Sequence, residues 1–221
     1  MFSHWKAVQL FFLSFLFPAA IFAQEEIPFP LENILPETRQ VILVQEKSSV
    51  NAQGQLTAWE YKQAWQKVLG PIDVTLGRNG VAEENQKREG DGRTPSGIFE
   101  LRRAFGYLPS VETELAYTQV QENDFWIDDP ESAYYNQWVK EAGSAKSFEC
   151  LKREDDLYKY TIIVEYNTSP VIAGHGSAIF FHIWRGPDKP TAGCIAMEEK
   201  NILKLLNWLD QNKNPAIYIR K

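Results

Sequence analysis

AIFFHIW, at residues 178–184, is the stretch of this sequence that best indicates the fold. Its side chains alternate as a strand with one buried face requires, because successive side chains of a strand point to opposite faces. Ile179, Phe181 and Ile183 fall on one face, which we expect to be the core, and His182 falls on the other. The stretch therefore predicts a strand that holds a histidine in a fixed direction.

Segments on either side of this strand carry the same kind of signal. They are short, rich in β-forming residues and bounded by glycine or proline. One helix is expected from about Glu198, because apolar residues recur at helical spacing up to Leu209. The sequence thus predicts a mainly-β (α+β) fold with one late helix. The other expected strands are 41–44, 56–61, 65–69, 72–76, 98–102, 160–166 and 216–219.

A long segment from Tyr107 to Phe148 shows no clear periodicity and is rich in aromatic residues. Irregular loops of that length inside a compact domain are usually functional. We therefore expect a functional loop. The chain of 221 residues otherwise suits one domain of moderate size, and its net charge of −6 argues against a nucleic-acid partner.

The first 23 residues differ from the rest, because a weakly basic start is followed by an apolar run that ends at Ala23. This pattern predicts a signal peptide over 1–23 and an exported protein of the periplasm or cell envelope. An uncleaved anchor is the alternative, although about 16 apolar residues are few for a span. After cleavage we expect no membrane span. Residues 24–40 are expected to form an extended lead-in.

Two cysteines, Cys150 and Cys194, allow two interpretations. In an oxidising compartment they can form a disulfide. Alternatively, the loop after His182 folds back and places the Cys194 thiol beside the imidazole, which lowers the pKa of the thiol and supplies a nucleophilic thiolate. Gly193 lets the backbone approach a substrate, and the amides near Cys194 are candidates for an oxyanion site. The neighbouring sequence favours the second interpretation.

Two blocks of sequence support the interpretation of Cys194 as a nucleophile. The first is GHGSAIFFH at 174–182, followed by TAGCI at 191–195, and the second is GRNG at 77–80, followed by GDGRTPSGIF at 90–99. They resemble the signature of the L,D-transpeptidase catalytic domain, the YkuD-type family, in which a strand histidine precedes an S/T-x-G-C motif. The resemblance runs from about Val41 to the C-terminus.

The resemblance implies a β-sandwich-like catalytic domain over residues 41–221 that acts on peptidoglycan stem peptides. Cys194 is then the nucleophile that a stem-peptide carbonyl acylates, His182 is the base and later the acid, and Gly193 shapes the oxyanion site. The common S-H-G-C-[IV]-R form is altered, because Ala192 and Ala196 replace its second histidine and its arginine. The chain therefore resembles a divergent branch.

The substrate-binding residues are expected around this motif, and stem-peptide carboxylates suit arginine. The candidates that we select are Arg185, Trp184, Thr191, Arg88 and His175, with Lys87 and Arg93 as further replacements for the missing arginine.

Three alternatives remain at the level of the sequence. A hydrolase would use the same acyl-enzyme with water as the acceptor. A non-catalytic peptidoglycan-binding domain would carry the Cys150–Cys194 disulfide. A metal triad of His175, His182 and Asp188 matches no dense ligand motif, so we expect neither a metal nor a cofactor.

Overall fold

The computed structural model describes residues 27–30, 34–47 and 52–221. The expected signal peptide and most of the lead-in lie outside these ranges. Within them, every helix is too short or too polar to traverse a bilayer.

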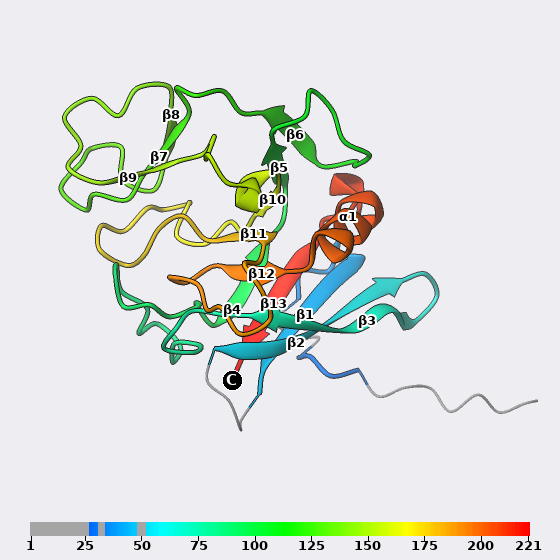
Figure 1. The fold of residues 1–221 in the computed structure, drawn as a ribbon. Coiled ribbons are helices and arrows are strands. Elements are labelled where there is room, and N and C mark those ends of the chain that lie inside the picture. Colours follow the sequence, from blue (N-terminus) through cyan, green and yellow to red (C-terminus); the bar gives the residue numbers. More distant parts are fainter. Residues whose placement is uncertain (1–26, 31–33, 48–51) are drawn as a thin grey trace, which may run out of the picture.

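Ten strands form one twisted sheet in the order β4-β13-β1-β2-β3-β12-β11-β10-β5-β6 (Figure 1). A second, three-stranded sheet has the order β8-β7-β9. The predicted mainly-β class with a single α-helix is confirmed. The strands are β1 Gln40–Glu46, β2 Gln53–Tyr61, β3 Trp65–Thr75, β4 Gly97–Glu100, β5 Arg103–Gly106, β6 Ala116–Gln119, β7 Phe125–Ile127, β8 Trp138–Val139, β9 Phe148–Cys150, β10 Tyr160–Ile163, β11 Phe180–Ile183, β12 Ile195–Met197 and β13 Ala216–Arg220.

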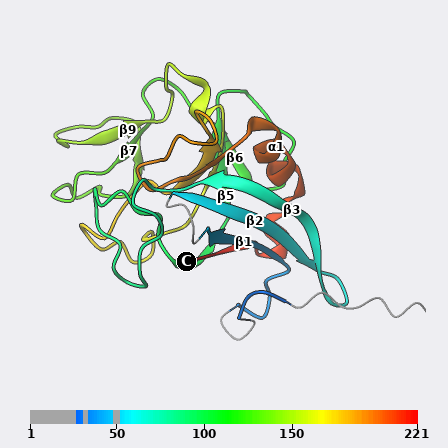
Figure 2. The same ribbon diagram turned by 60° about the horizontal axis from the view of Figure 1, so that its bottom comes forward.

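The helix α1, Glu199–Trp208, packs against one face of the large sheet (Figures 1 and 2). It buries Ile202, Leu205 and Leu206, as the helical spacing predicts. These side chains share a cluster with Ile179 and Phe181 from the 178–184 segment. Two 3₁₀ turns, η2 Asp156–Tyr158 and η3 Gln211–Lys213, complete the helical elements of the described residues.

The segment 65–76 differs from its prediction, because it forms one long strand and not two. β3 passes through Gly70 and Pro71, where a break was expected. Its pairing with β2 shifts register around Ala58, so an irregularity in the ladder absorbs the interruption. Gly70 is needed there, since its φ is +96° and a Cβ would lie 2.5 Å from the carbonyl oxygen of Leu56.

The segment after Tyr107 also differs, because it is not an irregular loop. It contains β6, β7 and β8 and leads into β9; we call residues 124–151 the cap. Trp126 of the cap is buried against Phe180, with ring centroids 5.1 Å apart. The face of β11 that carries His182 is therefore also covered, by a second core. This core consists of Phe105, Val120, Trp126, Leu151, Tyr158, Ile163, Ala178, Phe180 and Cys194.

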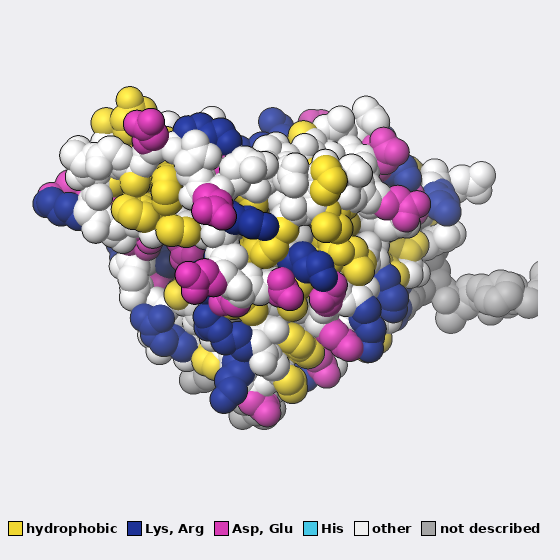
Figure 3. Space-filling view, turned by 45° about the horizontal axis from the view of Figure 1, so that its top comes forward, with side chains coloured by type: hydrophobic (Ala, Val, Ile, Leu, Met, Phe, Trp, Pro, Cys, Tyr) yellow, Lys and Arg dark blue, Asp and Glu magenta, His cyan; other side chains and the backbone are white. Residues whose placement is uncertain are grey.

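Asn136 joins the cap to the segment that leads into β11, the strand that carries the histidine. Its Oδ1 accepts from Trp126 Nε1 at 2.9 Å and from the Ala178 amide at 3.1 Å. Its Nδ2 donates to the carbonyl oxygens of Tyr166 and Asn167 at 3.0 and 2.7 Å. On the outer face that Figure 3 shows, lysine and arginine are interspersed with aspartate and glutamate.

Candidate active site

Cys194 and His182 lie on neighbouring strands. Cys194 directly precedes β12, which runs parallel to β11, and His182 pairs in register with Ala196. Both side chains line a pocket of about 210 Å³, so the structure brings the expected pair together.

The imidazole of His182 is oriented by two contacts. Its Nδ1 lies 2.8 Å from the carbonyl oxygen of Ile183. A carbonyl only accepts, so Nδ1 carries the proton and Nε2 is left with a free lone pair. The ring of Tyr158 meets the imidazole edge to face, with centroids 5.3 Å apart. The two contacts thus fix the direction of the ring, and in its neutral form Nε2 can accept a proton.

The Cys194 thiol donates to the carbonyl oxygen of Ala178 at 3.2 Å. Ala178 has φ +52°, in the left-handed region that alanine rarely adopts. Its amide is held by Asn136 Oδ1 at 3.1 Å. Strained backbone of this kind persists where the surroundings enforce it, and it clusters at functional sites. The cap therefore helps to aim the carbonyl that receives the thiol.

The turn before Cys194 is closed by Thr191. Its hydroxyl donates to the carbonyl oxygen of Cys194 at 2.6 Å and accepts from the Gly193 amide at 3.1 Å. A Cβ on Gly193 would lie 2.9 Å from the carbonyl oxygen of Arg93, so glycine is required by close approach. We expect Gly193 to shape the oxyanion site, and its own amide donates to Thr191 in this structure.

The expectation that the imidazole lowers the pKa of the thiol is wrong for this structure. Burial, followed by the charge of Glu149, raises the pKa of Cys194 to about 12. Burial lowers the pKa of His182 to about 4. Both groups are therefore uncharged at neutral pH, and the resting pair is a thiol and an imidazole. A thiol in this state is a weak nucleophile until a base removes its proton.

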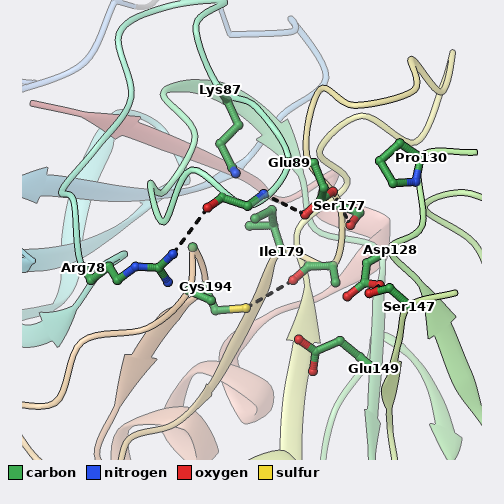
Figure 4. Close-up of a pocket in the computed structure, with 14 residues that line it drawn as sticks. Arg78, Lys87, Glu89, Asp128, Pro130, Ser147, Glu149, Ser177, Ile179 and Cys194 are labelled. Atoms are coloured by element: carbon green, nitrogen blue, oxygen red, sulfur yellow. Dashed lines mark hydrogen bonds between the residues drawn. The ribbon is translucent and has the colours of Figure 1, made fainter.

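A second pocket, of about 470 Å³, meets the first at Cys194. In Figure 4 the thiol lies between Arg78 on one side and Asp128 and Glu149 on the other. Burial raises the pKa of Asp128 and Glu149, and the neighbouring carboxylates raise them further. The residues that line both pockets are Glu149, Ala192 and Cys194.

The predicted binding residues fall into two groups. Arg185, Trp184 and Thr191 line the pocket that contains His182. Arg88 and His175 line neither pocket: the Arg88 guanidinium donates to the carbonyl oxygens of Asn85 and Lys87, and the carbonyl oxygen of His175 accepts from Tyr166.

The two further replacements for the missing arginine are also separated. Lys87 lines the larger pocket, where its ammonium group is bound to Asp91 at 2.7 Å. Arg93 lines neither pocket, and its guanidinium donates to the carbonyl oxygen of Val81 at 3.4 Å.

Sequence reasoning missed several residues that line the pocket with His182, among them Glu149, Arg153 and Tyr158. Glu149 lies on β9 of the cap, Arg153 in the segment that follows the cap, and Tyr158 in η2. These residues belong to a polar, acidic stretch of the sequence. They line the pocket because the cap packs on β11. Aromatic and charged side chains close together at 148–158 are the one local signal for them.

Cys150 and Cys194 are both free in the structure, so the alternative disulfide does not form there. Cys150 is exposed at the end of β9 and Cys194 is buried. In the described part of the chain, no three His, Cys, Asp or Glu side chains come close enough together to hold a metal ion.

Comparison with known proteins agrees with this geometry. The model of the YkuD family, described as the L,D-transpeptidase catalytic domain, matches residues 40–218. No curated protein matches the chain.

Proposed function

The chain belongs to the L,D-transpeptidase catalytic domain family, and from this premise we propose that it transfers an acyl group from one peptidoglycan stem peptide to an amine. The family consists of cysteine-dependent enzymes of the cell wall. Cys194 is the proposed nucleophile and His182 the proposed base.

The first half of the reaction forms a thioester. As Cys194 Sγ attacks the scissile carbonyl, its proton passes to Nε2 of His182, which the Ile183 contact leaves free. The tetrahedral intermediate then collapses: the C–N bond breaks, and the imidazolium returns the proton to the leaving amine. In the second half an acceptor amine attacks the thioester and gives its proton to His182. The C–S bond then breaks, which releases the acyl group as a new amide, and the imidazolium returns this proton to the sulfur.

The observation that carries the proposal is the position of Cys194 where two pockets meet. Acyl transfer needs room on both sides of the thiol: the acyl part of the donor stays on one side, and an acceptor amine takes the place of the leaving residue on the other, within reach of His182. Hydrolysis would need only water as the acceptor, so a second pocket supports transfer.

Mass spectrometry of the products from defined muropeptides tests this function. With an added amine acceptor, wild-type enzyme should give a cross-linked or amine-capped product, and Cys194→Ala should give none. Release of the terminal residue with no capped product, even at high amine concentration, would assign the enzyme as a hydrolase.

The same proposal includes export, with residues 1–23 as a cleaved signal peptide and the catalytic domain over 41–221. The apolar run that ends at Ala23 supports it. N-terminal sequencing of the protein recovered from the cell envelope tests it, since the mature chain should begin at Gln24.

A further inference from the structure

Arg153 lies in the pocket with His182 and Cys194, and two neighbours fix its guanidinium. Nε and Nη2 donate to the two carboxylate oxygens of Asp155 at 2.8 and 2.9 Å. The guanidinium carbon lies over the Tyr158 ring, 5.1 Å from its centroid. The third nitrogen, Nη1, is 4.0 Å from Glu149 Oε2, beyond hydrogen-bond distance. An arginine held in this way loses little side-chain entropy when it binds an anion.

The charge of this pocket favours an anion. Arg153, Arg185 and Lys189 line it, and among its described lining residues Glu149 is the one carboxylate. That carboxylate already accepts a hydrogen bond from the Tyr158 hydroxyl at 2.9 Å. Because the side chain of Arg153 is only 29% exposed, water screens its charge less than it screens that of Arg185, which is 62% exposed. Arg153 is therefore the cation of the pocket best placed to bind an anion strongly.

The reaction determines where the leaving part of the donor lies. When the C–N bond breaks, the leaving amine takes a proton from His182, so it must lie within reach of the imidazole. His182 lines the same pocket as Arg153, and it does not line the larger pocket. The leaving residue therefore occupies the side of Cys194 where Arg153 is held.

We propose that Arg153 binds the α-carboxylate of the donor residue that leaves during acylation. In a donor whose scissile bond is its last peptide bond, only the amide nitrogen and one α-carbon separate this carboxylate from the scissile carbonyl. Planar guanidinium and carboxylate groups match in geometry, and charge-assisted hydrogen bonds between them are strong. The inference rests on the proposed function and adds to it the residue that recognises the leaving end of the donor.

Acylation in the absence of an acceptor amine tests this assignment. Two tetrapeptide donors are compared, one with a free C-terminal carboxylate and one with a carboxamide, and intact-protein mass follows the adduct on Cys194. Wild-type enzyme should prefer the carboxylate by about tenfold or more in its second-order acylation rate, the discrimination that one hydrogen bond to a charged group provides. In Arg153→Gln this ratio should fall close to one.

Arg153→Lys should give an intermediate ratio, because it keeps the charge and loses the planar fork; it also serves if Arg153→Gln does not fold. The matched control is Arg102→Gln, because Arg102 is an exposed arginine that pairs with Glu100 and lines neither pocket, and its ratio should equal that of wild type. Equal rates for the two donors in wild type, or an unchanged ratio in both Arg153 variants, would overturn the assignment and leave the proposed function standing.

Two further outcomes of this experiment would also decide the assignment of Arg153. A carboxylate preference that appears only when an acceptor is present, and that follows the carboxylate of the acceptor, would place that group at Arg153 and overturn the donor assignment. Failure of wild-type enzyme to be acylated by either donor would overturn the proposed function itself, and this inference with it.

Discussion

Tyr158 connects the cap to the proposed base, because its ring meets the ring of His182 edge to face at 5.3 Å, with 66° between the ring planes. The Tyr158 hydroxyl donates to Glu149 on β9 at 2.9 Å. One buried side chain thus contacts the imidazole with its ring and the cap with its hydroxyl. Since the imidazole must aim Nε2 at a thiol that is still protonated, its orientation bears directly on the rate.

Tyr158→Phe should keep the ring contact with His182 and lose the bond to Glu149. We expect the acylation rate to fall by about tenfold, because the lost hydrogen bond is to a carboxylate. Tyr158→Ala should lower both the rate and the unfolding midpoint much more, because it also removes a buried ring. Stopped-flow acylation and thermal unfolding measure the two effects. Equal rates in the two variants would show that the ring does not position the imidazole.

Cys194→Ala should abolish acylation while the protein stays folded. Both cysteines are free, so the substitution breaks no cross-link. The change removes a sulfur from a small buried site, so only a modest loss of stability is expected, within the usual range of about 0.5–3 kcal/mol. Circular dichroism and intact mass after incubation with a donor provide the check. Cys150→Ser is the matched control and should be acylated like wild type; acylation of Cys194→Ala would place the nucleophile elsewhere.

Local periodicity predicted the parts of the fold that depend on local sequence. Alternation over 178–184 and helical spacing up to Leu209 both correspond to elements of the structure. The cap was missed because its strands are two or three residues long, too short for periodicity to appear. The Gly70–Pro71 step was read as a break because propensity takes no account of the neighbouring strand β2 that carries β3 through it.

The residues of the candidate site also divide into those that a local motif predicts and those that it does not. Cys194 and His182 come from short motifs that are close in the sequence, so a motif could point to them. Glu149, Arg153 and Tyr158 enter through the packing of the cap, which no local pattern records. The protonation states of Cys194 and His182 could not be predicted either, because they depend on burial, which is a property of the folded chain.

Alkylation of Cys194 should depend steeply on pH. Iodoacetamide reacts with the thiolate, and burial raises the pKa of this thiol to about 12. The rate should therefore rise by about tenfold per pH unit from pH 7 to pH 10, with no plateau. Cys150→Ser leaves Cys194 as the one cysteine in the sequence, so the measurement is free of the exposed thiol. A plateau below pH 9 would instead indicate a preformed thiolate–imidazolium pair.

Stability should also depend on His182 in mildly acidic solution. Burial lowers its pKa from 6.5 to about 4, so the unfolded state binds the proton more tightly. The penalty is absent above pH 6.5 and grows as the pH falls towards 4, where it approaches about 3 kcal/mol. Urea unfolding at pH 7 and at pH 4.5 should show a smaller loss for His182→Gln than for wild type. An equal loss would mean that His182 is protonated in the folded protein.

The choice between His182 and His175 decides the chemistry of the site. His182 is fixed by the Ile183 carbonyl and the Tyr158 ring, in the pocket that holds Cys194. His175 lines neither pocket. His182→Ala should therefore lose at least about a hundredfold in acylation rate, the usual contribution of a general base, and His175→Ala should stay within about threefold of wild type. Because burial keeps the thiol neutral over this range, the loss should persist at every pH from 6 to 9. The reverse result would transfer the role of base to His175.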